Sequence, residues 1–133
     1  MILSDKDILK RIDNWSIVIK WPDDYRDHVN ASSMDLTLWN KFKIFKNTSY
    51  IDTKKLWELT ELQELNTIIL KPWEFILWVT EEYIELPNDL VARVEWRSSF
   101  WRLWLLIHAT AWFIDAWFKG TITLEICNIN SSP

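Results

Sequence analysis

The chain has 133 residues, a length typical of a single domain with one sizeable core. Its 15 Lys and Arg and 19 Asp and Glu give a net charge of −4, and the pI of about 5.1 argues against a nucleic-acid partner. The longest stretch without a formal charge, residues 103–114, is too short for a bilayer span of roughly 20 residues. The first residues lack the apolar segment of a signal peptide. We therefore expect a cytoplasmic protein with no membrane partner.

The first predicted element is a short helix. Ser4 is a good N-cap and Asp7 follows three residues later, which is a capping-box pattern. An apolar face that includes Ile12 follows. Asn14-Trp15 then occupies the point where a helix normally stops with a glycine. The sequence therefore predicts a helix that begins after Ser4 and ends before Trp15.

The rest of the chain alternates with a period of two. Apolar and polar residues alternate over residues 34–38, 41–44, 90–95 and 122–127. Short strands at close spacing, without a long helical pattern, favour an all-β barrel or sandwich. Residues 54–65 are ambiguous between a polar loop and one helical turn.

Glycine and tryptophan occur in an unusual ratio. The chain has 1 Gly and 11 Trp, whereas the usual glycine frequency of about 7% predicts about 9 Gly. Trp39-Asn40 joins two alternating runs, where a two-residue hairpin favours Gly-Asn. Pro72-Trp73 stands where a type II turn favours Pro-Gly. A tryptophan at positive φ would cost about 1–3 kcal/mol at each such site.

Two interpretations of the tryptophans follow. In the first, which we prefer, many of them are glycines, for example because the source genome reads the UGA codon as glycine. Gly120 would then be the glycine that an ordinary codon specifies. In the second, the tryptophans are real, and the chain is a Trp-rich β module that binds a carbohydrate or a protein partner.

The densest polar cluster is Arg97-Ser98-Ser99-Phe100-Trp101-Arg102. Two guanidinium groups and two hydroxyls on a flexible backbone suit a polyphosphate, although a capped surface turn would have the same composition. Asp115 emerges from an apolar run, as a turn aspartate or as a carboxylate facing a sugar hydroxyl or a water.

Glu125 lies in an alternating strand, opposite the apolar face. It is either a solvent-facing strand residue or a buried general acid/base with a pKa raised by desolvation. His108 is expected in the core. Cys127 is the lone cysteine, so an intrachain disulfide is excluded. The spacing of the two His and one Cys does not fit a metal site, and the zinc-deaminase signature is absent from the sequence.

These same residues resemble the dCTP deaminase family of the dUTPase-like superfamily. Two segments are similar to family motifs: Trp96–Trp104 to G-R-S-S-L-G/A-R-L-G, and His108–Gly120 to H-x-T-A-G-F-I-D-P-G-F-x-G. The other similar segments are Met1–Leu9, Asn30–Trp39, Glu85–Leu90 and Thr121–Glu125. Tryptophan falls on family glycines at positions 39, 73, 96, 104, 112 and 117, and often at 78 and 101. The resemblance implies a distorted dUTPase-like β-barrel (a β-clip) with a short N-terminal helix. Residues 1–133 would form one such domain, without the family's last strands and C-terminal tail.

The resemblance also implies a function. The reaction would be hydrolytic deamination of dCTP to dUTP and ammonia, without zinc, in a homotrimer with active sites between subunits. Glu125 would be the general acid/base, and Asp115 would accept a hydrogen bond from the deoxyribose 3′-hydroxyl. The substrate site would further comprise Arg97, Ser98, Ser99, Phe100, Trp101 and Arg102 around the triphosphate with its Mg²⁺, and the backbone of Thr123 and Leu124 at the base. A bifunctional deaminase and dUTP pyrophosphatase, or a simple dUTPase, is the alternative within the same fold.

Overall fold

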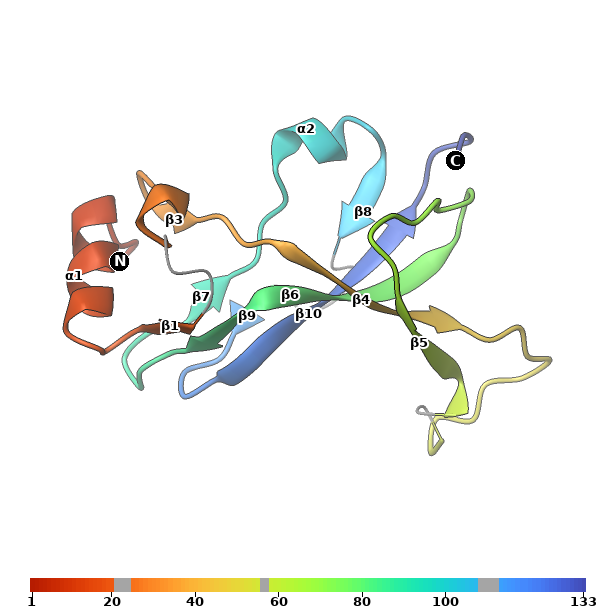
Figure 1. Ribbon diagram of the computed structural model, residues 1–133, viewed down its shortest axis with the longest axis horizontal. Coiled ribbons are helices and arrows are strands. Elements are labelled where there is room, and N and C mark those ends of the chain that lie inside the picture. Colours follow the sequence, from red (N-terminus) through yellow and green to blue (C-terminus); the bar gives the residue numbers. More distant parts are fainter. Residues whose placement is uncertain (21–24, 56–57, 108–112) are drawn as a thin grey trace. The chain divides into compact units, whose positions relative to one another are not determined.

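The computed structural model describes residues 1–20, 25–55, 58–107 and 113–133 (Figure 1). His108, Trp112 and the rest of the 108–112 segment of the predicted motif lie outside the described residues. The chain divides into two compact units. Unit 1 comprises Met1–Leu38, Thr80–Val94 and Trp112–Ile122, and unit 2 comprises Trp39–Val79, Glu95–Ala111 and Thr123–Pro133. That the whole chain forms one domain stays a prediction.

Unit 1 contains the N-terminal helix and several short strands. Its elements are α1 (Asp5–Asp13), β1 (Val18–Lys20), a 3-10 helix η1 (Tyr25–His28), β2 (Val29–Asn30), β3 (Ser33–Met34), β7 (Ala92–Arg93) and β9 (Phe113–Ile114). All the pairings are antiparallel: β2 with β3, β7 with β9, and β1 with the end of the long strand β6 (Phe75–Glu85). The apolar core of this unit includes Ile12, Ile17, Ile84, Leu86, Ile114 and Ile122.

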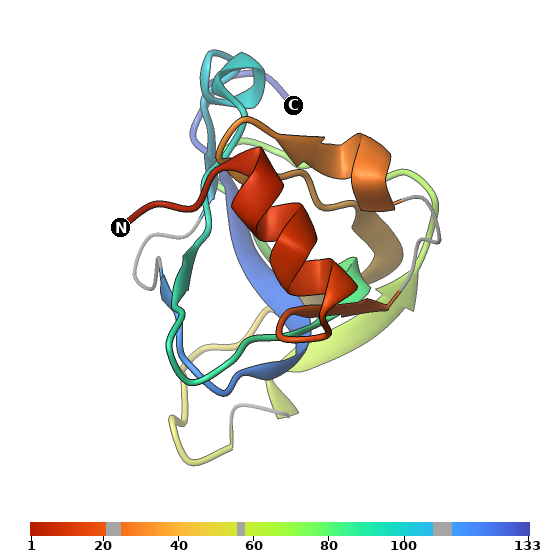
Figure 2. The same cartoon turned by 90° about the vertical axis from the view of Figure 1, so that its left-hand side faces the viewer.

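Helix α1 begins and ends as the sequence predicts. The Ser4 hydroxyl accepts a hydrogen bond from the Asp7 backbone N–H at 3.2 Å, as expected of an N-cap. At the other end, the N–H of Trp15 donates to Ile12 and the N–H of Ser16 donates to Arg11. These two bonds form a Schellman motif, in which Trp15 adopts φ 63°. The Asp5 N–H bonds the Ala31 carbonyl between β2 and β3 at 2.9 Å, and Figure 2 shows α1 beside these strands.

Unit 2 is a β-sheet with one helical turn. Its elements are β4 (Leu38–Phe45), β5 (Thr60–Glu64), the first half of β6, α2 (Ser98–Trp101), β8 (Leu105–Ile107) and the second half of β10 (Lys119–Asn128). The first residue of β4, Leu38, is counted in unit 1. The strands follow the order β5-β4-β6-β10-β8. Phe42, Leu59, Ile76, Leu124 and Ile126 are buried here. The alternation predicted for residues 122–127 is confirmed, because Ile122, Leu124 and Ile126 are all buried.

One local prediction is wrong and two are correct only in part. Trp39-Asn40 is not a hairpin turn, because both residues lie inside β4, whose later residues Lys41–Phe45 pair with β5. Residues 54–65 were expected to be a loop or one helical turn; a 3-10-type bond from the Glu58 N–H to the Lys55 carbonyl at 3.0 Å is present, but Thr60–Glu64 form the strand β5. The strand expected over residues 90–95 is limited to Ala92–Arg93. In contrast, the predicted turn at Pro72-Trp73 is confirmed: the Glu74 N–H bonds the Lys71 carbonyl at 3.0 Å, and Trp73 has φ 63°.

Candidate functional site

The predicted phosphate-binding segment forms a single helical turn. Arg97 precedes α2 in an extended conformation, and its carbonyl accepts hydrogen bonds from the N–H groups of Phe100 at 3.0 Å and Trp101 at 3.4 Å. Every residue from Arg97 to Arg102 is exposed. The backbone is therefore that of a surface turn, and its guanidinium and hydroxyl groups are open to solvent, where a ligand can reach them.

A cavity of about 300 Å³ lies directly after this turn. Its walls are Trp101, Arg102, Trp104 and Ile129. The Ile129 N–H bonds the Trp104 carbonyl at 3.0 Å, and this bond fixes the turn to the end of β10. Three of the wall residues are apolar and Arg102 is charged, so the cavity combines an apolar wall with one cation that can hold an anionic group.

Strand β10 positions the predicted catalytic glutamate. Leu124 is buried, Thr123 is exposed, and Glu125 is half-buried on the face opposite Leu124. Glu125 thus lies between the two alternatives that the sequence left open, because it is neither fully solvated nor fully buried. A carboxylate in such a position can contact a ligand while it retains some hydration.

Glu125 and the cavity belong to the same face of β10. Continuing the alternation of the strand places Ile129, a cavity residue, on the face that carries Glu125. The two positions are four residues apart, which is about 13 Å at a strand's rise of ~3.3 Å per residue. A single extended ligand that reaches both Glu125 and the cavity must therefore span about this distance.

Asp115 lies in unit 1, at a turn that follows β9. Its carbonyl accepts a hydrogen bond from the Phe118 N–H at 3.2 Å, and its side chain is exposed. Trp117 occupies the third position of this turn with φ 67°. Asp115 is therefore a turn aspartate, as one of the two interpretations predicted, and its carboxylate is exposed to solvent.

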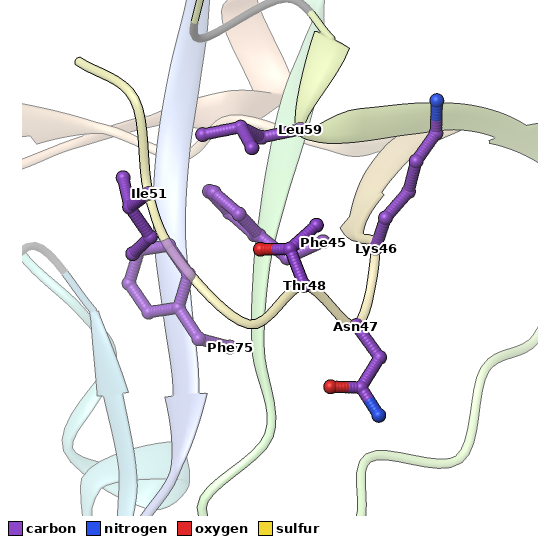
Figure 3. Close-up of a pocket in the computed structure, with 7 residues that line it drawn as sticks. All are labelled: Phe45, Lys46, Asn47, Thr48, Ile51, Leu59 and Phe75. Atoms are coloured by element: carbon purple, nitrogen blue, oxygen red, sulfur yellow. The ribbon is translucent and has the colours of Figure 1, made fainter.

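Sequence reasoning missed the larger cavity, which has about 420 Å³ and lies in unit 2 (Figure 3). Phe45 and Phe75 meet there edge to face, with ring centroids 5.5 Å apart, and Ile51 and Leu59 complete the apolar wall. The amino group of Lys46 points away from these side chains. None of the predicted site residues lines this cavity. The sequence signal was weak because Ile51 comes from a segment without regular structure.

The remaining candidate groups add little reactive chemistry. Burial raises the pKa of the Cys127 thiol above its ordinary value, which keeps the thiol protonated at neutral pH and disfavours a nucleophilic role. In the described ranges, His, Cys, Asp and Glu side chains do not gather in groups of three or more that could hold a metal ion. Within those same ranges, the helices are too short or too polar to cross a membrane.

Comparisons with known proteins show which family the chain resembles. The family model described as dCTP deaminase-like matches residues 2–133. The chain is 46% identical to the dUMP-forming dCTP deaminase of Dictyoglomus turgidum, covering 100% of this chain and 72% of the relative. It is 43% identical to the dUMP-forming enzyme of Methanobrevibacter smithii, covering 99% and 72%, and 38% identical to the dCTP deaminase of Natronomonas pharaonis, covering 100% and 72%.

A solved structure has the same fold. The crystal structure of 2′-deoxycytidine 5′-triphosphate deaminase from Agrobacterium tumefaciens matches with a TM-score of 0.72 at 23% identity. The match covers 94% of this chain and 41% of the crystallised one. It confirms the predicted dUTPase-like fold of mainly β-strands with a short N-terminal helix. Because the family model spans residues 2–133 and the identities reach 46%, the chain belongs to the dCTP deaminase-like family.

Proposed function

We propose that this chain hydrolyses dCTP, in the cytoplasm, to remove the 4-amino group, and that it then releases dUMP. The observation that carries the proposal is its similarity, over its whole length, to relatives named dCTP deaminase. The first step consumes one water and gives dUTP and ammonia. The second step consumes another water and gives dUMP and pyrophosphate.

The second step is favoured by a division among the relatives. Five of them are named dUMP-forming and are 43–46% identical to this chain, whereas three named simply dCTP deaminase are 37–40% identical. A chain that resembles the first group more strongly is expected to share its product. The alternatives are a deaminase that stops at dUTP and a simple dUTPase.

Glu125 is the proposed general acid/base. Deamination requires a group that takes a proton from the attacking water as oxygen bonds to C4 of the cytosine. That proton is passed to the ring nitrogen N3 as the C4=N3 double bond opens. The proton of the new C4 hydroxyl is then passed to the amino nitrogen, so that ammonia leaves as the C4–N bond breaks and C4=O forms. A half-buried carboxylate on β10 is suited to this work because it is partly desolvated and is held by a regular strand. The backbone of Thr123 and Leu124 would read the base beside it.

The Arg97–Arg102 segment is the proposed triphosphate site. Arg97 and Arg102 would neutralise phosphate oxygens, and the Ser98 and Ser99 hydroxyls would donate to them, while Phe100 and Trp101 complete the turn. Mg²⁺ enters as part of the substrate, bound to the triphosphate oxygens. Asp115 would accept a hydrogen bond from the 3′-hydroxyl, which its exposed carboxylate permits.

A homotrimer with shared sites is part of the proposal. Arg102 borders a cavity that lies about 13 Å along β10 from Glu125, so complementary groups from a second copy could complete either end. The turn around α2 also exposes apolar side chains, with Phe100 at 41% and Leu103 at 59%. Exposed apolar groups beside a polar cluster are typical of surfaces that a partner covers.

Product analysis tests the function. The protein purified from its source is incubated with dCTP and Mg²⁺, and ammonia, dUTP, dUMP and pyrophosphate are measured over time. We expect equal amounts of ammonia, pyrophosphate and dUMP. A zinc-selective chelator should leave these amounts unchanged. Ammonia with dUTP alone would limit the function to deamination. Pyrophosphate from dUTP with no ammonia from dCTP would support a dUTPase, and no product from either nucleotide would contradict the proposal.

Subunit mixing tests the shared site. Light scattering gives the mass of the assembly, which we expect to be three chains. Glu125→Gln and Arg102→Ala subunits are then unfolded, mixed and refolded together. Activity that returns only in the mixture indicates that one site draws on two chains, whereas an inactive mixture indicates that each site lies within one chain.

A further inference from the structure

The positive φ angles of this chain coincide with its tryptophans. Among the described residues other than glycine, positive φ occurs at Trp15 (63°), Trp73 (63°), Trp104 (60°) and Trp117 (67°). Only a few per cent of non-glycine residues adopt this left-handed conformation, mostly Asn, Asp and His, and a bulky residue there is an outlier. Four of the eight described tryptophans do so, and no other described residue type except glycine does.

Each of these tryptophans also closes a turn that is typical of glycine. Trp15 is the C′ residue of the Schellman motif that ends α1. Trp73 and Trp117 are the third residues of turns closed by the bonds Glu74 N–H to Lys71 and Phe118 N–H to Asp115. Trp104 N–H bonds the Trp101 carbonyl at 3.0 Å, where the chain leaves the α2 turn. The hydrogen bonds are made by the backbone, so they require the conformation and not the side chain.

The four indoles are largely exposed, and of the four only Trp104 borders the 300 Å³ cavity described above. Their exposed fractions are 78% for Trp15, 74% for Trp73, 61% for Trp104 and 68% for Trp117. A tryptophan normally stabilises a protein by burying its large ring. These residues therefore combine a backbone that disfavours any side chain with a side chain that contributes little burial.

A fifth tryptophan has a different misfit. The indole nitrogen of Trp96 is buried and has no hydrogen-bond partner in the part of the chain that the structure describes. Buried indole N–H groups usually find an acceptor. Trp96 has an ordinary φ, so this observation is independent of the turn geometry.

We propose that residues 15, 73, 104 and 117, written as tryptophan, are glycine in the protein that the cell makes. Glycine adopts φ near 60° without a steric penalty and meets the requirement of all four turns. The natural cause is a codon, UGA, that the source organism decodes as glycine and that a different code translates as tryptophan. The inference rests on backbone geometry and holds whatever reaction the protein catalyses.

Peptide mass spectrometry of the native protein is the direct test. The protein is purified from the organism that encodes it and is digested, and the peptides that contain positions 15, 73, 104 and 117 are sequenced. We expect glycine at all four, each peptide being lighter by the difference between an indolylmethyl group and a hydrogen. We also expect UGA at the four codons in the gene. Tryptophan in any of these peptides, or UGG at any of these codons, would overturn the proposal.

A matched set of variants tests the physical argument separately. Three synthetic genes encode Trp, Ala or Gly at the four positions and are otherwise identical. Alanine removes the indole but keeps the Cβ, so it isolates the backbone requirement from the loss of the ring. We expect the glycine protein to be soluble, with a Tm at least about 10 °C above that of the alanine protein. We expect the tryptophan protein to be no more stable than the alanine one.

The outcomes are distinct from those of the functional assay. Equal Tm values for the glycine and alanine proteins would contradict the inference, because they would show that left-handed φ is not required. A tryptophan protein more stable than both would contradict it too. Absence of deaminase activity in a stable glycine protein would count against the proposed function only, and would leave the glycine assignment intact.

Discussion

Arg11 of α1 holds both carboxylate oxygens of Asp89, at 3.1 and 2.7 Å, across 78 positions of sequence. The pair joins the helix to the segment that follows β6 in unit 1. The hydrogen bonds from Arg11 lower the pKa of Asp89 below its ordinary value of 3.8, and they also raise the pKa of Arg11. The two-point geometry is that of an arginine fork on a carboxylate.

This pair predicts a pH-dependent contribution to stability. Because the pKa of Asp89 is lower in the folded state, its contribution is complete above the unfolded value near 3.8 and is lost as the pH falls through the folded value. We expect Asp89→Asn to lower the Tm by a few degrees at pH 7. The difference from the parent protein should shrink progressively as the pH falls below 3.8.

The control for this experiment is Asp27→Asn, which removes a charge from an exposed side chain of η1. Thermal unfolding of the three proteins across the pH range measures the effect. A loss of Tm in Asp89→Asn that stays constant down to pH 2, or an equal loss in the Asp27 variant, would contradict the prediction.

Glu82 provides a second prediction, because it is completely buried in β6. Its two carboxylate oxygens lie 2.8 and 3.0 Å from the backbone nitrogen of Thr37, which donates to them. Glu82→Ala would remove the acceptor of that N–H at a part-buried position. We expect a loss of about 1–3 kcal/mol in the free energy of unfolding.

Urea denaturation measures this loss against two other variants. Glu82→Gln keeps an acceptor at the same place and should lose less. Glu81→Ala removes the neighbouring carboxylate, which points to the other face of β6 and is not fully buried, so it should change the midpoint little. Identical midpoints for the two alanine variants would show that the Thr37 contact does not stabilise the fold.

The ends of local elements were predictable from the sequence because their signals are local. Ser4 and Asp7 form the helix cap within one turn. Positions 15 and 73 could be identified as sites that favour glycine because the few residues of each turn determine the φ angle there. Glu125 was placed on the correct face by the alternation of its own strand. In each case the information lies within a few residues of the position concerned.

The errors have the opposite origin, because they depend on partners distant in sequence. β5 has polar residues on both faces and becomes a strand through pairing with Lys41–Phe45 of β4. Just before this pairing, the Leu65 N–H bonds the carbonyl of Asn40 at 2.9 Å, where the sequence suggested a turn. Glu82 is charged and would be expected outside, and its burial depends on Thr37, 45 residues away. Composition and periodicity do not carry such information.

Catalysis supplies the third prediction. Glu125→Gln keeps the size and the hydrogen-bonding capacity of the side chain but removes its acid/base function. In the glycine form of the protein, we expect ammonia release from dCTP to fall by at least about 10²- to 10⁴-fold. Binding of dCTP, measured by calorimetry, should remain within about threefold of the parent value.

Glu61→Gln is the matched control, since Glu61 is an exposed carboxylate of β5 away from the proposed site residues. It should release ammonia at the parent rate. Near-normal ammonia release by Glu125→Gln would remove Glu125 from the mechanism. A parallel loss of dCTP binding would instead assign Glu125 to substrate binding.

The last prediction concerns Arg102, the charged residue in the wall of the 300 Å³ cavity beside α2. If this cavity holds phosphate, Arg102→Ala removes charge-assisted hydrogen bonds that a nucleoside cannot make. We expect the affinity for dCTP to fall at least about tenfold, while the affinity for deoxycytidine stays unchanged. Calorimetry with both ligands measures the two effects in one protein.

Lys54→Ala makes the same change in net charge at an exposed position outside this cavity wall, and it should alter neither affinity. Equal losses of affinity for dCTP and deoxycytidine would show that Arg102 acts on the base or on folding. A loss of dCTP affinity of the same size in the Lys54 variant would show that the effect comes from net charge alone.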